Sequence, residues 1–337
     1  MCSVTAIGSV RQSIEIALVS LLFLVAFVGW TKGAGVDGDW SFTTPSREAG
    51  WLSVRDDGGK FTAELLWGVG AARPVADLKV TDGTLSFVRG IKRPLAPKEE
   101  PAVSYRITSR LAGEVLRFTM IPLKGGEAAE FFGKRMPPLP PRPDLSRVRF
   151  GDAFALFNGR DLAGWHPSNP VKKNGWSVRE GVLCNDTPKT DFGAYGEYAN
   201  LRTDADFTDF QLHLEFRLPR EVGGNSGIYL RGLYEVQVTH RDSSMQGING
   251  PGAIFGRIKP AKNAGKPAGE WESYDITLVD RHVTVVLNGE KVIDNEPVVG
   301  PTGGALHSDV TAPGPIYLQG DHTAVQYRNI TLRSVRR

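Results

Sequence analysis

The residues with the clearest chemical potential lie in the stretch 223–239, where two short β-runs flank a glycine-rich turn. In a strand, successive side chains point to opposite faces. The pattern therefore predicts that Tyr229 and Arg231 share one face, and that Glu235 and Gln237 lie on the same surface beside the turn. A ring, a guanidinium, a carboxylate and an amide suit a sugar, because polar groups bond its hydroxyls and a ring covers its apolar face. A solvated sheet face is the competing interpretation.

Composition sets the class of protein. The chain has 337 residues, of which 41% are hydrophobic and 23% charged, which is typical of a globular protein with material for two domains. A net charge of +3, without a long Lys/Arg run, does not indicate a nucleic-acid partner. The 39 glycines and 22 prolines, with frequent Asp-Gly and Asn-Gly pairs, predict many turns and short strands. We therefore expect an all-β fold.

Residues 1–35 have the layout of a secretory signal peptide. Arg11 precedes a nearly unbroken apolar run, 16–30, and small residues follow it. We expect export to the periplasm or the extracellular space, with the mature chain beginning near residues 34–36. An uncleaved anchor is the alternative, and it is the one membrane association that the sequence suggests. Because Cys184 is the only cysteine after this segment, no internal disulfide is expected.

The remaining chain divides at a proline-rich segment. Residues 36–135 predict six or more antiparallel strands joined by turns such as Asp82-Gly83, in a meander that closes on itself. The segments GDWSF and FFGKR resemble small lipocalin-like β-domains of exported bacterial proteins, which implies a small β-barrel with a scaffold or accessory sugar-binding role. Residues 136–148 predict an extended linker, because proline supplies no amide donor. Residues 149–337 then form the second domain.

Several motifs of the second half identify a family. In order they are FNGRDLAGW, GNSGIYLRG with YEVQV, PGAIFG, GEWESYDI, VVLNGEKVIDN, and GPIYLQGDH with YRNI, and they span roughly residues 149–335. Together they resemble the 3-keto-disaccharide hydrolase family. The resemblance implies a concanavalin-like β-jelly-roll sandwich of two antiparallel sheets. The strict alternation of Phe or Leu with polar residues over 210–218 independently favours the same fold.

The resemblance also implies a reaction, cleavage of the glycosidic bond in disaccharides whose C3 hydroxyl has been oxidised to a ketone. The ketone acidifies the proton on C2, so a base can remove it, the enolate can expel the glycosidic oxygen, and water can add back. We expect Glu235 to be the base and His213 or Glu215 to relay the proton. Direct hydrolysis by Glu215 and Glu235 as paired carboxylates is the other route. The sequence leaves both routes open.

Substrate contacts are expected around the glycine-rich turn and near the C-terminus. Tyr229 and Phe255 are the platform candidates, because both adjoin glycine-rich turns where a ligand can approach closely. Asp321 stands where the family resemblance implies a histidine, and His322 is shifted by one position. The residues expected to bind substrate are Asn225, Ser226, Tyr229, Arg231, Gln237, Phe255, Gln319 and Asp321.

Other chemistries find no support in the sequence. It has no HExxH, CxxC, GxSxG or Walker motif, and its six histidines are scattered singly. We expect no cofactor and no metal, although a structural calcium on loop carboxylates such as Asp186, Asp191 or Asp309 stays open. The expected partner is an oxidised disaccharide or glycoside. A non-catalytic glycan-binding module of the lectin or laminin-G type is the alternative function, because one fold serves both.

Overall fold

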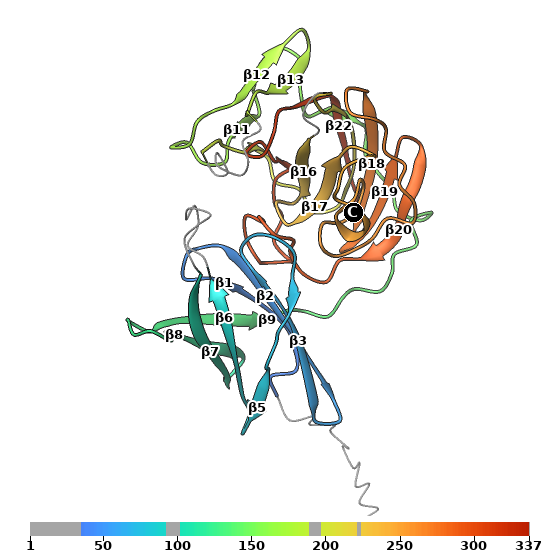
Figure 1. The fold of residues 1–337 in the computed structure, drawn as a ribbon. Coiled ribbons are helices and arrows are strands. Elements are labelled where there is room, and N and C mark those ends of the chain that lie inside the picture. Colours follow the sequence, from blue (N-terminus) through green and yellow to red (C-terminus); the bar gives the residue numbers. More distant parts are fainter. Residues whose placement is uncertain (1–34, 92–101, 189–196, 221–223, 337) are drawn as a thin grey trace, which may run out of the picture. The chain divides into compact units, whose positions relative to one another are not determined.

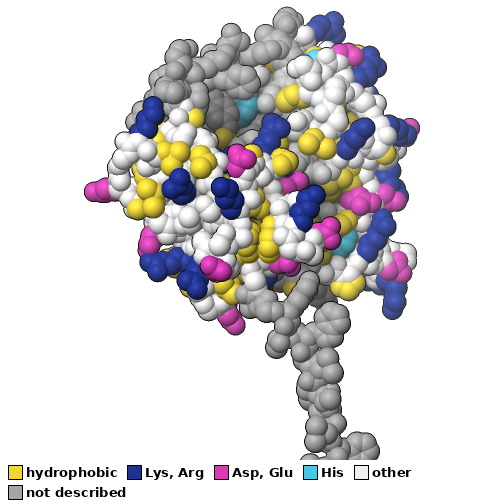
Figure 2. All heavy atoms as spheres, turned by 60° about the horizontal axis from the view of Figure 1, so that its bottom comes forward, with side chains coloured by type: hydrophobic (Ala, Val, Ile, Leu, Met, Phe, Trp, Pro, Cys, Tyr) yellow, Lys and Arg dark blue, Asp and Glu magenta, His cyan; other side chains and the backbone are white. Residues whose placement is uncertain are grey.

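The computed structural model describes residues 35–336 apart from 92–101, 189–196 and 221–223. The predicted signal segment therefore lies almost entirely outside the described residues. Within them, the one helix is a 3₁₀ turn, Gly247–Asn249, and no helix is long and apolar enough to cross a membrane. The all-β expectation is confirmed. Figure 2 shows Lys and Arg side chains interspersed with Asp and Glu over one face of the molecule.

The first half of the chain forms one antiparallel sheet (Figure 1). The strands follow one another through hairpins, and the turn at Asp82-Gly83 has the two positive φ angles, 48° and 70°, that a tight hairpin turn requires. The order across the sheet is β4-β3-β2-β1-β9-β8-β7-β6-β5. The strands are β1 (Gly38–Thr43), β2 (Ala49–Asp57), β3 (Lys60–Trp67), β4 (Arg73–Pro74), β5 (Lys79–Thr81), β6 (Thr84–Ile91), β7 (Val103–Ala112), β8 (Val115–Pro122) and β9 (Ala129–Arg135).

The predicted closure of this sheet is incomplete within the described residues. Strand β1 pairs with β9, which joins the two ends of the segment, but the edge strands β4 and β5 form no ladder with each other. Alternate side chains of the sheet form a hydrophobic cluster that includes the fully buried Trp40 and Phe118. The structure thus shows an open nine-stranded sheet with its own core, and the lipocalin-like assignment stays a prediction.

The proline-rich segment 136–148 contains no strand or helix. It contacts the second half, because Arg281 donates to the carbonyl of Pro137 at 3.1 Å and Asn295 donates to that of Pro143 at 2.8 Å. Among the described residues, no strand pair joins the first-half sheet to the sheets of the second half, although residues 35–337 cluster as one compact unit. The division into two domains, with the second at residues 149–337, stays a prediction.

The second half consists of two antiparallel sheets (Figure 1). The eight-stranded sheet has the order β12-β13-β22-β15-β18-β19-β20, with β10 also paired to β22. Its strands are β10 (Phe154–Ala155), β12 (Trp176–Arg179), β13 (Val182–Asn185), β15 (Phe210–Arg217), β18 (Glu272–Val279), β19 (His282–Leu287), β20 (Glu290–Pro297) and β22 (Val325–Ser334). The five-stranded sheet has the order β11-β14-β21-β16-β17. Its strands are β11 (Trp165–Pro167), β14 (Leu201–Thr203), β16 (Asn225–Leu230), β17 (Tyr234–Thr239) and β21 (Tyr317–Leu318).

These two sheets share one hydrophobic core. Along β15 the buried residues Phe210, Leu212 and Phe216 alternate with partly exposed polar ones, as the sequence predicted. They join one cluster with Ile228 and Val236 from the five-stranded sheet. Each fully buried side chain of this kind contributes roughly 1.5–3 kcal/mol. The inward faces therefore hold the sheets together face to face, which confirms the predicted jelly-roll sandwich.

Candidate functional site

The candidate site lies on the face of the five-stranded sheet that is turned away from the core. In the β16–β17 ladder Tyr229 stands opposite Glu235 and Gly227 opposite Gln237, and β21 places Tyr317 beside Tyr229. The residues between them along each strand belong to the hydrophobic core. Because side chains alternate along a strand, these residues share the opposite face. The structure thus brings Tyr229, Glu235 and Gln237 together, as the sequence predicted.

Glu235 is a deeply buried carboxyl group on this face, with 3% of its surface exposed. Tyr229 Oη lies 3.0 Å from Glu235 Oε2 and 2.8 Å from the carbonyl oxygen of Gly303. The carbonyl can only accept, and the tyrosine has one proton. When that proton goes to Gly303, the contact with Glu235 requires a proton on the carboxyl group.

The electrostatic environment of Glu235 favours the same protonation state. The pKa of Glu235 is raised from 4.5 to about 8, mainly by burial; the hydrogen bond from Tyr229 opposes this rise, and the negative charge of Asp321 adds to it. At pH 7 the folded protein therefore holds Glu235 mostly as the neutral acid. This corrects the expectation that Glu235 is the base, because a base must be ionised at neutral pH.

Arg231 does not reach the site. Strand β16 ends at Leu230, and Arg231 and Gly232 follow in a tight turn with φ angles of 57° and 62°. The guanidinium group turns toward a neighbouring loop, where it donates to the carbonyl oxygens of Val310 at 2.9 Å and Ala312 at 3.0 Å. Its predicted role as a substrate ligand is corrected to that of a loop anchor.

Next to Glu235 the structure places an aspartate–histidine pair. His322 Nδ1 lies 2.6 Å from Asp321 Oδ1, and the two side chains are 12% and 10% exposed. The charge of Asp321 contributes to the raised pKa of Glu235, and Asp321 follows Gln319, whose backbone amide donates to Gly227 beside Glu235. A carboxylate that accepts from Nδ1 orients the ring and fixes its tautomer. His322 was not among the predicted site residues, and its signal was the one-position shift of the family's histidine.

Two glutamines supply buried acceptors to the same face. The backbone amide of Gln319, just after β21, donates to the carbonyl oxygen of Gly227 at 2.9 Å, and Gly227 stands opposite Gln237 in the β16–β17 ladder. Gln237 Nε2 donates to Asn225 Oδ1 at 2.8 Å, but the Oε1 atoms of Gln237 and Gln319 are buried and find no donor among the described residues. An unsatisfied buried acceptor costs roughly 1–3 kcal/mol. Sugar hydroxyls are suitable donors for both.

Gly227 leaves the space that Glu235 occupies. A Cβ atom at this position would lie 2.2 Å from Glu235 Oε1. The exposed fraction rises from 3% at Glu235 to 9% at Asp321, and Asn225 and His322 are partly exposed. The cluster therefore opens to solvent at that end. The cluster of Tyr229, Glu235, Gln237, Asn225, Gln319, Asp321 and His322 is hereafter called the acid–histidine site.

Two other predicted substrate ligands lie differently. Ser226 faces the core, where its Oγ lies 2.7 Å from the carbonyl oxygen of Gln319 and 2.8 Å from Tyr327 Oη. It alternates with the site residues and therefore cannot join them, which corrects that prediction. Phe255 is half-buried, and its amide donates to the carbonyl of Glu235 at 2.9 Å, so its backbone borders the site beside β17.

His213 and Glu215 belong to the other sheet. Both project from β15 on the side away from the core, where His213 Nδ1 lies 2.7 Å from Asp275 and Glu215 binds Arg328 at 2.8 Å. The hydrophobic core of the sandwich separates this face from Glu235. The predicted proton relay and the predicted Glu215–Glu235 carboxylate pair are therefore both wrong. The sequence showed which residues alternate, but not that these two strands belong to different sheets.

Two surface cavities lie away from the acid–histidine site. One, of about 400 Å³, is on the first-half sheet, and the other, of about 290 Å³, is lined by residues of the eight-stranded sheet such as Arg217 and Gln326. Glu235 lines neither. Among the described residues, no three His, Cys, Asp or Glu side chains converge on a metal position. Asp186 is paired with Arg179, Asp309 binds Thr311, and Asp191 lies outside the described residues.

A family model described as the 3-keto-alpha-glucoside-1,2-lyase-like domain matches residues 152–333. The chain belongs to this family. The resemblance inferred from the motifs of the second half is thereby confirmed, and the domain is carbohydrate-active and resembles glycosidases.

Solved structures give weaker likenesses. Two candidate glycosyl hydrolases from Parabacteroides distasonis are 29% and 22% identical to this chain. The alignments cover 60% and 55% of this chain and 94% of each of those chains, both with a TM-score of 0.44. The carbohydrate binding module CBM66 from Bacillus subtilis is 13% identical, with 51% and 96% covered and a TM-score of 0.35. With TM-scores below 0.5, these likenesses carry no argument about function. A search of curated proteins found no match.

Proposed function

We propose that the second half of the chain cleaves the glycosidic bond of 3-keto-glycosides by elimination, followed by addition of water. The family supports the class of substrate. The observation that carries the mechanism is the buried carboxyl group of Glu235, whose pKa is raised to about 8, beside the Asp321–His322 pair, because the two together supply an acid and a base. This assignment reverses the role expected for Glu235, since a carboxyl group that keeps its proton at neutral pH acts as the donor.

The first step forms an enolate. The imidazole of His322, oriented by Asp321, takes the proton from C2, and the C–H electron pair becomes the C2–C3 double bond of the enolate. The C3 carbonyl then re-forms, a C1–C2 double bond appears, and the bond from C1 to the glycosidic oxygen breaks. Glu235 gives its proton to the departing oxygen. The products are an unsaturated 3-keto sugar and the free alcohol, with His322 protonated and Glu235 ionised.

Addition of water restores both groups. Ionised Glu235 takes a proton from the water that attacks C1, and His322 returns its proton to C2. The net reaction is hydrolysis, and each catalytic group ends in its starting state. The buried Oε1 atoms of Gln237 and Gln319 would accept hydrogen bonds from the sugar hydroxyls and so hold the ring over Gly227.

The test compares the full chain on the 3-keto and the unoxidised form of one nitrophenyl glucoside. We expect nitrophenol release from the 3-keto form only, and in D₂O we expect deuterium at C2 of the sugar product. Release without deuterium at C2 would favour direct hydrolysis. Binding of an unoxidised oligosaccharide, with no turnover of any 3-keto glycoside, would instead identify a glycan-binding module.

We also propose that the protein is exported. The apolar run and the small residues after it support this proposal, as argued from the sequence. Intact mass of the protein from its native host is the test. A mass that starts near residues 34–36 is expected, and a mass that includes residues 1–30 would indicate an anchor instead.

A further inference from the structure

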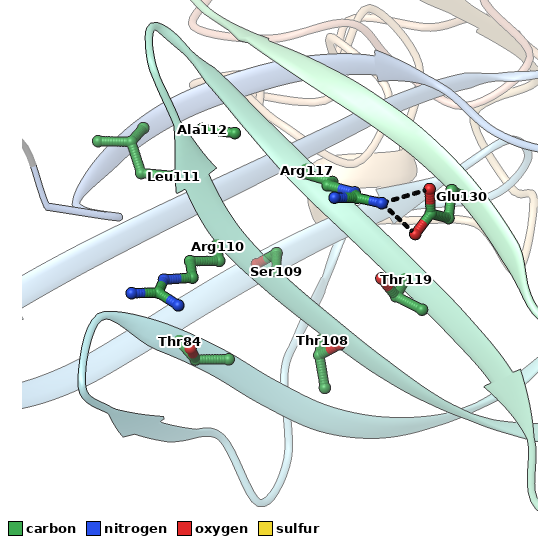
Figure 3. Close-up of a pocket in the computed structure, with 9 residues that line it drawn as sticks. All are labelled: Thr84, Thr108, Ser109, Arg110, Leu111, Ala112, Arg117, Thr119 and Glu130. Carbon is green, nitrogen blue, oxygen red and sulfur yellow. Dashed lines mark hydrogen bonds and ion pairs between the residues drawn. The ribbon is translucent and has the colours of Figure 1, made fainter.

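The first-half sheet carries a polar groove on the face turned away from its core. The groove has a volume of about 400 Å³ and lies across β6 to β9 (Figure 3). Its walls include two arginines, one glutamate and three half-buried threonines, namely Arg110, Arg117, Glu130, Thr84, Thr108 and Thr119. Leu116 and Phe118, which alternate with Arg117 along β8, are fully buried on the other side of the sheet. The polar side chains of β8 therefore face solvent.

The two arginines differ in their partners. Arg110 and Arg117 stand directly opposite each other across β7 and β8. Arg117 forms an ion pair with Glu130 at 2.7 Å, whereas Arg110 points away from this pair (Figure 3). Like charges directly opposite each other destabilise a sheet. Glu130 is the only acidic residue that lines the groove, so within the described structure Arg110 remains an uncompensated cation suited to a carboxylate.

An exposed ring extends the same surface. Phe132 lies opposite Arg117 across β8 and β9, and 55% of its surface is exposed. A ring so exposed beside cations and hydroxyls matches a sugar, whose C–H face stacks on the ring while its hydroxyls bond to threonines. The groove holds a net charge of only +1 from Arg110, Arg117 and Glu130, which is small for a polyphosphate ligand.

We propose that this groove binds an acidic polysaccharide, with a uronate carboxylate on Arg110 and a sugar ring on Phe132. The threonine hydroxyls would contact neighbouring sugar hydroxyls. Such a site would hold the protein on an acidic glycan independently of the acid–histidine site. The inference does not depend on the reaction proposed above, because it uses other residues and another ligand.

The experiment measures binding of the full chain to polygalacturonate, to a neutral glucan and to duplex DNA by calorimetry. We expect polygalacturonate to bind at least tenfold more tightly than either alternative, and binding to weaken as salt is raised. The Arg110→Ala variant should weaken binding by about tenfold, because it removes the cation that pairs with the uronate carboxylate. The Phe132→Ala variant should also weaken it.

The matched control is Arg147→Ala, which removes the same charge from an exposed arginine of the linker. It should leave polygalacturonate binding unchanged, and Arg110→Ala should leave 3-keto-glucoside cleavage unchanged. Absence of binding, equal binding to DNA, or an equal loss with Arg147→Ala would overturn the proposal. None of these results would bear on the activity of the acid–histidine site. Failure of the glycan-binding proposal can therefore be distinguished from failure of the proposed reaction.

Discussion

Replacement of Glu235 by glutamine tests the protonation state on which the proposed mechanism depends. The carboxyl group is buried, with 3% of its surface exposed, and its pKa is raised from 4.5 to about 8 by that burial. Glutamine has nearly the same shape and no charge at any pH. The variant therefore removes the titration and keeps the packing.

The magnitude follows from linkage. Because the pKa of Glu235 is raised on folding, its contribution to stability is fully present below pH 4.5 and is lost as the pH rises through about 8. Each pH unit between these values costs the wild type about 1.4 kcal/mol of unfolding free energy, while Glu235→Gln lacks this slope. Between pH 5 and pH 8 the variant should gain about 3.5 kcal/mol relative to the wild type.

Urea unfolding of both proteins at pH 5 and pH 8 measures this difference. An exposed glutamate, Glu127, provides the matched control, and Glu127→Gln should show the same free-energy difference from the wild type at both pH values. Cleavage of the 3-keto-glucoside by Glu235→Gln should fall by about two to four orders of magnitude. A free-energy difference between Glu235→Gln and the wild type that does not change with pH would refute the claim that Glu235 is a neutral acid.

Three further changes test the site geometry. Gly227→Ala places a Cβ atom 2.2 Å from Glu235 Oε1, so cleavage should fall at least about tenfold and stability by roughly 1–3 kcal/mol, and an unchanged rate would contradict the placement. Asp321→Asn should lower kcat by about two to four orders of magnitude with little change in the melting temperature, because His322 loses the carboxylate that orients it. His213→Ala, on the other sheet, should retain activity within about threefold of the wild type, and a larger loss would restore it to the mechanism.

The amino-acid sequence determined the local features. Alternation in 210–218 predicted the inward and outward residues of β15, and it placed Tyr229, Glu235 and Gln237 on one face. The Asp82-Gly83 turn followed from residue types that tolerate positive φ. These features depend on neighbours within a few positions, so a single strand or turn contains the information. The ordered motifs of the second half predicted the family for the same reason, since each motif is a short stretch.

Tertiary structure decided what depends on distant contacts. The pairing of β15 with β18 and β22 places His213 in the eight-stranded sheet. The alternation of residues along β15 alone does not indicate the sheet to which the strand belongs. Asp321 and His322 lie beside Glu235 because β21 pairs with β16. Strand β16 is more than eighty positions earlier in the chain than β21. Burial by these elements, and not the residue type, raises the pKa of Glu235 and makes it an acid. The prediction that Arg231 binds substrate is wrong because β16 ends one residue before it, at a turn. Long-range packing then directs its guanidinium group to loop carbonyls.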